Sequence, residues 1–239
     1  YCKVLVGNSS TGILEAPALG TPSINIGLRQ SGRIAAKSVQ TIADFKLDAT
    51  KKADFDKIEN FYAQVASGYG LAKNNEKFEE YANLIKNKST LASIYNTYAW
   101  ASAEKKENLP FATKISKQSL SLLEAAKLDP RPAYMASQED YLKSIESSYA
   151  SYADTYALLL AHSGNYTEAL KFQEEAVTKN NYSRPEMNAR YVDFLAKNSQ
   201  NEKVVTFAEK FIKAGQGTEE MKLNLKTAYK GTVPFETYY

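Results

Sequence analysis

The stretch Tyr152–Val177, YADTYALLLAHSGNYTEALKFQEEAV, decides the fold of most of this chain. Both halves have the apolar spacing of a helix, and the residues between them, Ser163–Asn165, form a turn sequence. The second half begins at Asn165 and has Glu168 three residues later, the pattern of a capping box. The stretch therefore predicts two antiparallel helices joined at Ser163–Asn165.

Small residues in the second half indicate how closely the two helices pack. Ala169 and Ala176 lie two helical turns apart, where a tight helix pair requires small side chains. The order of Gly164, an aromatic residue, Ala169 and Ala176 resembles a tetratricopeptide unit, although Ala153 stands where that repeat has a tryptophan. Because such units stack on one another, the resemblance implies a tetratricopeptide-like helical hairpin array.

Apolar stripes predict further helices on both sides of this hairpin. They lie within Phe55–Val65, Phe78–Ile85, Leu91–Glu104, Pro110–Ala125, Gln138–Ala161, Met187–Phe194, Val204–Phe211 and Thr218–Lys230. Gly68–Gly70 predicts a break between the first two, and the proline-containing Lys127–Gln138 predicts a long loop. Ser183 with Glu186 predicts a second capping box. The fold class expected is thus mainly α.

Composition excludes several classes of function. The chain has 239 residues and a net charge of +3, from 30 basic and 27 acidic residues that are mixed along the sequence. This mixture predicts a solvated surface and no nucleic-acid partner. One cysteine and one histidine argue against a disulfide or a metal site, and we expect no cofactor. No segment has the length and apolarity of a membrane span, and the N-terminus has no export-signal pattern, although a chain that starts with Tyr1 does not settle its compartment.

The first forty residues have a different pattern. A strand at Cys2–Val6, a polar turn, a helix at Thr11–Leu19 and a strand at Pro22–Ile26 predict a small N-terminal βαβ, Rossmann-like fragment. The turn, GNSSTG, places backbone N–H groups and hydroxyls at a helix N-terminus, which favours an anion such as a diphosphate. The alternative is that its serines only cap the helix. Both interpretations fit the residues taken alone.

Residues 4–39, which include VGNSSTGILEAPALGTPSINIGLRQSGRIAAKSV, resemble the C-terminal UDP-binding segment of hydrolysing UDP-N-acetylglucosamine 2-epimerases. The resemblance implies that Ser9 and Ser10 hold the UDP diphosphate and that Glu15 binds ribose hydroxyls. It also implies roles in shaping the loop and lining the same cleft for Asn8, Thr11, Gly12, Arg29, Gln30 and Arg33. Thr11 stands where serine is common, and Leu28 stands where aspartate often precedes the Arg-Gln pair.

The resemblance covers only part of such an enzyme. Those enzymes resemble two Rossmann-like domains that close over a nucleotide sugar, whereas the likeness here spans about one βαβ unit. The carboxylates and the histidine that the family uses for catalysis have no counterpart, and His162 matches nothing in it. We therefore expect UDP or a UDP-sugar as a ligand, no catalytic residues and no turnover by this chain alone.

Residues 45–239 resemble the tetratricopeptide-like helical region of TlpA-type thioredoxin-like proteins. The segments NTYAWASAEKKENLPFATKISKQSLSLL and PEMNARYVDFLAKN carry the likeness together with the central hairpin. The Cys-x-x-Cys motif of the thioredoxin fold is absent, so no redox activity is expected. The first likeness implies a cytoplasmic location and the second a periplasmic or exported one, so the location stays open.

Two functions follow from two expected domains, 1–40 and 41–239. The first is UDP-sugar binding by the βαβ fragment, and the second is a protein-interaction scaffold that binds a protein or peptide on the helical array. The 17 tyrosines fit an exposed binding face as well as packing between helices. Trp100 is expected in the helical core and His162 in a solvated loop.

Overall fold

The computed structural model describes residues 5–7, 23–26, 39–42 and 52–231, and it describes side chains from residue 57 onward. The chain divides into two compact units, Tyr1–Asn60 and Phe61–Tyr239. The described residues are mainly helical, which confirms the expected fold class at this level.

Three short strands lie in the first unit. They are β1 (Leu5–Gly7), β2 (Ser23–Ile26) and β3 (Val39–Ile42), and they form a parallel sheet in the order β1-β2-β3. Leu5 pairs with Ser23, and Ser23 pairs in turn with Val39. The sequence predicts the first two strands and misses the third. The expected helix at Thr11–Leu19 lies outside the described residues.

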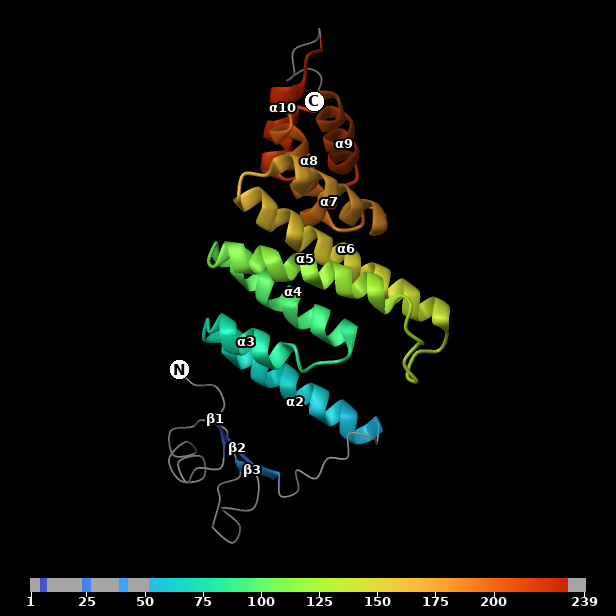
Figure 1. The fold of residues 1–239 in the computed structure, drawn as a ribbon. Coiled ribbons are helices and arrows are strands. Elements are labelled where there is room, and N and C mark those ends of the chain that lie inside the picture. The colour runs from blue at the N-terminus through green and yellow to red at the C-terminus, as the bar shows by residue number, and fades with distance from the viewer. Residues whose placement is uncertain (1–4, 8–22, 27–38, 43–51, 232–239) are drawn as a thin grey trace. The chain divides into compact units, whose positions relative to one another are not determined.

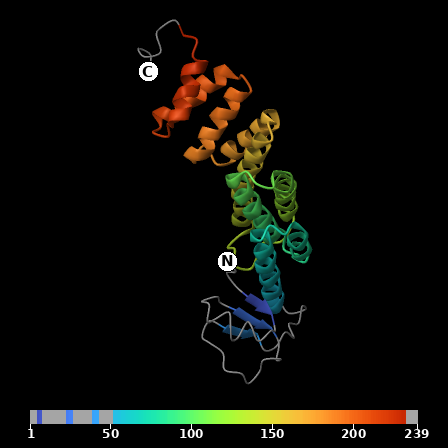
Figure 2. The same cartoon turned by 90° about the vertical axis from the view of Figure 1, so that its left-hand side faces the viewer.

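The part of the chain that the structure describes contains nine helices (Figure 1). They are α2 (Lys52–Leu71), α3 (Asn75–Ala82), α4 (Lys88–Lys105), α5 (Leu109–Ala126), α6 (Gln138–His162), α7 (Tyr166–Lys179), α8 (Pro185–Lys197), α9 (Asn201–Lys213) and α10 (Glu219–Ala228). Successive helices of the second unit run back and forth in hairpins (Figures 1 and 2). Helix α4 packs on α5, α6 on α7, and α8 on α9, and α10 packs on both α8 and α9.

The central hairpin has the predicted turn. Gly164 has φ +79°, a conformation that favours glycine because a Cβ would be strained there. Asn165 accepts a hydrogen bond from the backbone N–H of Glu168 at 3.3 Å, and its amide donates to the Glu168 carboxylate at 3.1 Å. Ala169 and Ala176 are fully buried, as their spacing predicts.

Small side chains on α6 explain how closely α6 and α7 can pack in this hairpin. Ala153, Ala157 and Ala161 recur every fourth residue along α6 and belong to the same buried cluster as Ala169 and Ala176 of α7. In the α3–α5 region the core is aromatic instead. The rings of Phe78 and Tyr98 lie 4.8 Å apart, and Phe111 packs edge-on against both. Each hairpin therefore buries its own apolar stripe against the next helix.

The predicted break at Gly68–Gly70 is wrong, because α2 continues through it to Leu71. Glycine serves packing here. A Cβ on Gly70 would lie 2.9 Å from Cδ2 of Tyr98 and 3.1 Å from a ring carbon of Phe78, whereas one on Gly68 would meet nothing within 4 Å. Gly70 lets two aromatic rings approach the helix backbone.

The predicted capping box at Ser183 is also wrong. Helix α8 begins at Pro185 after the N-cap Arg184, without a side-chain capping bond. Proline fits the first helical position, since its φ is already helical and no N–H is required there, and this fixes the start one residue later than predicted. Thr218 does cap α10, through the N–H of Met221, but that helix ends at Ala228 instead of Lys230.

Candidate functional site

The residues that the sequence assigns to UDP lie outside the described residues. They are Asn8, Ser9, Ser10, Thr11, Gly12, Glu15, Arg29, Gln30 and Arg33. The neighbouring strands are described, and their pairing makes the ends of β1 and β2, at Gly7 and Ile26, neighbours at one edge of a parallel sheet. The assignment of these nine residues stays a prediction.

A buried ion pair joins separate hairpins of the helical unit. Asp154 of α6 is 3% exposed, and Arg190 of α8 contacts it through two nitrogens of the guanidinium group. Nε of Arg190 lies 2.9 Å from Oδ1 of Asp154, and Nη2 lies 2.5 Å from Oδ2. A fork of this kind fixes direction as well as distance, so it links α8, which packs on α7, to α6.

Gln173 of α7 completes this cluster. It is fully buried, and its amide nitrogen donates to Oδ1 of Asp154 at 2.8 Å and to the carbonyl of Met187 at 3.0 Å. Its Oε1 atom has no hydrogen-bond partner among the described residues. Three helices thus meet at one carboxylate.

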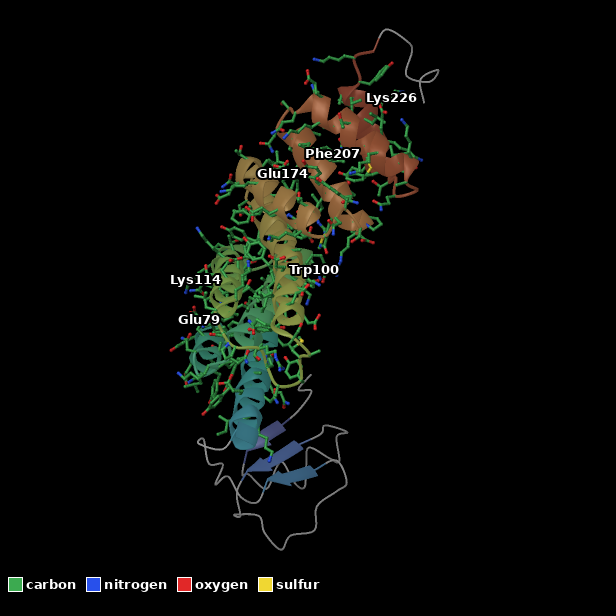
Figure 3. All side chains as sticks on the ribbon, turned by 90° about the vertical axis from the view of Figure 1, so that its right-hand side faces the viewer. Glu79, Trp100, Lys114, Glu174, Phe207 and Lys226 are labelled. Carbon is green, nitrogen blue, oxygen red and sulfur yellow. The ribbon has the colours of Figure 1, made fainter. Side chains whose placement is uncertain are left out.

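Trp100 of α4, labelled in Figure 3, lies near the same arginine. The Arg190 guanidinium carbon is 5.8 Å from the centre of the indole ring, a cation–π geometry. Trp100 is half-buried, so the expectation of a core position is met only in part. The tryptophan and the guanidinium form a mixed aromatic and cationic surface.

Two tyrosine–glutamate pairs also link adjacent helices. The phenolic oxygen of Tyr149 lies 3.0 Å from Glu175, and that of Tyr191 lies 3.0 Å from Glu174. Burial, together with these carboxylates, raises the pKa of both phenols well above the usual range. Both phenols therefore stay protonated and act as hydrogen-bond donors.

His162 is the last residue of α6, whereas the sequence predicts a solvated loop position. Its Nε2 atom lies 3.1 Å from the carbonyl oxygen of Ala103 in α4, so it joins two hairpins. Burial lowers the pKa of this imidazole, and the nearby Lys106 lowers it further. The imidazole therefore links the end of α6 to α4.

A small cavity of about 210 Å³ lies among α2, α3, α4 and the turn that joins α4 to α5. The hydroxyl of Tyr98 donates to Oδ1 of Asn75 at 2.7 Å, and the amide of Asn108 lies within 2.9 Å of the same oxygen. Lys73 and Glu107, also on its rim, form an ion pair of 2.7 Å. These polar groups satisfy one another, so the cavity offers mainly apolar surface.

No cluster of three or more metal-ligating side chains occurs among the described residues. None of the helices in the same residues is long and apolar enough to span a membrane. The polar cluster at Asp154 cannot be found from the sequence, because Gln173 and Arg190 lie 19 and 36 residues from Asp154 along the chain.

Parts of the chain are similar to three curated proteins. It is 36% identical over 90 residues to the UDP-N-acetylglucosamine 2-epimerase of Neisseria meningitidis and 45% identical over 58 residues to the GDP/UDP-N,N'-diacetylbacillosamine 2-epimerase (hydrolyzing) of Campylobacter jejuni. It is also 36% identical over 82 residues to polysialic acid biosynthesis protein P7 of Escherichia coli. These matches cover 35%, 24% and 34% of this chain and 22%, 14% and 20% of those proteins.

The chain therefore spans about a fifth or less of the length of the curated relatives it matches. No protein-family model and no solved structure matches it significantly. An epimerase-like segment is what these similarities support.

Proposed function

We propose that residues 1–40 form a Rossmann-like βαβ fragment that binds the diphosphate of UDP or of a UDP-sugar. The observation that carries the proposal is the sequence GNSSTG, which begins at the last residue of β1, together with relatives whose names include two nucleotide-sugar 2-epimerases. In this proposal Ser9 and Ser10 hold the diphosphate through hydroxyls and backbone N–H groups at a helix N-terminus.

The strand pairing supports a site at one edge of the sheet. Nucleotides bind outside the carboxyl ends of parallel strands, and β1 and β2 are parallel neighbours that end at Gly7 and Ile26. Ser9 follows the first end closely in the sequence, and Arg29 follows the second. Successive loops at one edge are thereby proposed to supply hydroxyls and guanidinium groups to the same anion.

The remaining assigned residues have supporting roles in this proposal. Glu15 accepts hydrogen bonds from ribose hydroxyls, and the other residues shape the loop or line the cleft: Asn8, Thr11, Gly12, Arg29, Gln30 and Arg33. The proposal is for binding and not for turnover, because general acid–base groups have no assigned residues in this chain.

Calorimetric titration of UDP into the chain tests this function. We expect a dissociation constant near the millimolar range, which corresponds to a binding free energy of about 4 kcal/mol. We expect Ser10→Ala to abolish this binding. Ser121→Ala is the matched control, because Ser121 is an exposed serine on α5. Equal UDP affinity in the wild type and Ser10→Ala would refute the proposed site.

A second candidate function is a tetratricopeptide-like interaction scaffold formed by residues 41–239. Small residues at equivalent positions of the α4–α5 and α6–α7 hairpins favour it, because all of them are fully buried. The equivalent pairs are Ala99 with Ala157, Ala112 with Ala169, and Ser119 with Ala176. The resemblance to TlpA-type proteins adds the proposal that the scaffold serves a thioredoxin-like protein. Pull-down of a thioredoxin-like domain by wild type but not by Trp100→Ala would favour this function, and equal recovery by both would count against this surface.

A further inference from the structure

A second opening in the helical unit adjoins the first cavity, with which it shares Ile94. It is an open groove of about 330 Å³ between the first turns of α4, the loop 127–137 and the first half of α6. More than half of the side chains that line it carry a hydroxyl. Those from α4 and α6 with aliphatic hydroxyls are Ser89, Thr90, Ser93, Ser144 and Ser148.

Charged side chains are absent from the residues that line this groove, although 24% of the chain's residues are charged. Of the charged residues that adjoin the lining in sequence, Lys88 pairs with Asp129 at 2.6 Å, and the Arg131 guanidinium donates to the Met135 carbonyl. A charged ligand would lose water here without gaining a counter-ion, which disfavours it. The lining therefore selects an uncharged ligand.

Several of the hydroxyls have no internal partner. Within residues 52–231, no hydrogen bond engages the hydroxyl of Ser89, Thr90, Ser144 or Ser148. A hydroxyl can donate and accept at once, so a row of free ones suits a ligand that does both. By contrast, the Tyr141 hydroxyl donates to the Ala126 carbonyl at 3.1 Å and forms part of the groove's frame.

An exposed tyrosine on a hydrogen-bonded loop lines the groove. Tyr134 is 82% exposed. Around it, the N–H of Arg131 donates to Oε1 of Gln138 at 2.9 Å, the amide of Gln138 donates to the Asp129 carbonyl at 3.3 Å, and the Arg131 guanidinium donates to the Met135 carbonyl. A ring presented by a preorganised loop loses little entropy on contact with a ligand.

We propose that this groove binds a neutral saccharide of one or a few rings. The rim of a sugar ring carries hydroxyls, which match Ser89, Ser144 and Ser148, and its C–H face is apolar and can lie on Tyr134. The volume falls at the small end of the roughly 300–1,000 Å³ of ligand pockets. A neutral extended peptide fits less well, because it requires an exposed strand edge and the groove's two long walls are helices.

The full chain, isotopically labelled, can be titrated with the neutral trisaccharides maltotriose, cellotriose and triacetylchitotriose and followed by NMR. We expect at least one of them to shift the resonances of Ser144, Ser148 and Tyr134 in a saturable manner. Tyr134→Ala should weaken that binding by about tenfold or more, and Ser144→Lys, at an exposed position, should abolish it by filling the groove. Leu128→Ala, which alters an equally exposed residue of the same loop outside the groove's lining, should bind like the wild type.

Three outcomes would overturn the proposal. The first is the absence of saturable shifts with all three sugars, and the second is saturable binding that Tyr134→Ala and Ser144→Lys leave unchanged. The third is binding of an uncharged serine- and threonine-rich peptide at the same residues while the sugars fail. Spectra of the variants without ligand establish that each one folds.

Discussion

The ion pair between Asp154 and Arg190 provides the sharpest test of the helical packing. We expect Arg190→Met to destabilise the chain strongly. Among the described residues, it leaves a carboxylate that is 3% exposed with the amide of Gln173 as its one remaining partner. Removing one member of a buried ion pair typically costs about 3–5 kcal/mol. Because the Arg190 side chain is 24% exposed, the lower end, about 3 kcal/mol, is expected.

The double variant Asp154→Leu/Arg190→Met separates this cost from the loss of packing. It removes the buried charge together with its partner, so most of the stability should return, as found when buried pairs are replaced by apolar residues. Urea unfolding followed by circular dichroism measures both variants. A loss below about 1 kcal/mol for Arg190→Met would refute the reasoning, because exposed pairs behave in that way.

Four other expectations follow from the described residues. Ala169→Phe should cost about 1–3 kcal/mol in urea unfolding by overpacking a fully buried site, and a neutral result would exclude close approach there. Gly68→Ala should stabilise α2 by about 0.5–1 kcal/mol, whereas Gly70→Ala should destabilise it, since its Cβ meets Tyr98; equal melting temperatures would contradict this. Deletion of residues 1–40 should leave cooperative thermal unfolding, and its loss would tie that segment to the helical core. Burial lowers the pKa of His162 below its usual value of 6.5, so the unfolded state takes up the proton at a higher pH than the folded state. The free energy of unfolding should therefore fall as the pH drops below about 6.5, and it should fall less in His162→Gln. A fall of the same size in that variant would show that another group causes the pH dependence.

The sequence predicts those elements that depend on local chemistry. The turn at Gly164 follows from a residue that favours positive φ, and the cap at Thr218 follows from a hydroxyl placed three residues before a free N–H. The loop at 127–137 follows from two prolines that disfavour helix before them. Each of these signals lies within a few residues of the feature it predicts.

Features that depend on distant residues are missed. Gly70 looks like a helix break in sequence, and only the rings of Phe78 and Tyr98 reveal why a glycine occurs inside α2. Strand β3 crosses the expected domain boundary after residue 40, and its pairing with β2 is what identifies it as a strand. For the candidate sites, the UDP-binding residues come from a sequence motif, whereas the hydroxyl groove becomes visible only when α4 and α6 are packed together.

The central claim is that nucleotide binding belongs to residues 1–40 and not to the helical unit. Backbone NMR of the labelled full chain during titration with UDP tests it most directly. We predict shifts confined to Asn8–Glu15 and Arg29–Arg33, with residues 61–231 unchanged. Shifts on the helical unit while these two segments stay unchanged, or no shift at any UDP concentration up to about ten times the millimolar constant expected, would contradict the claim.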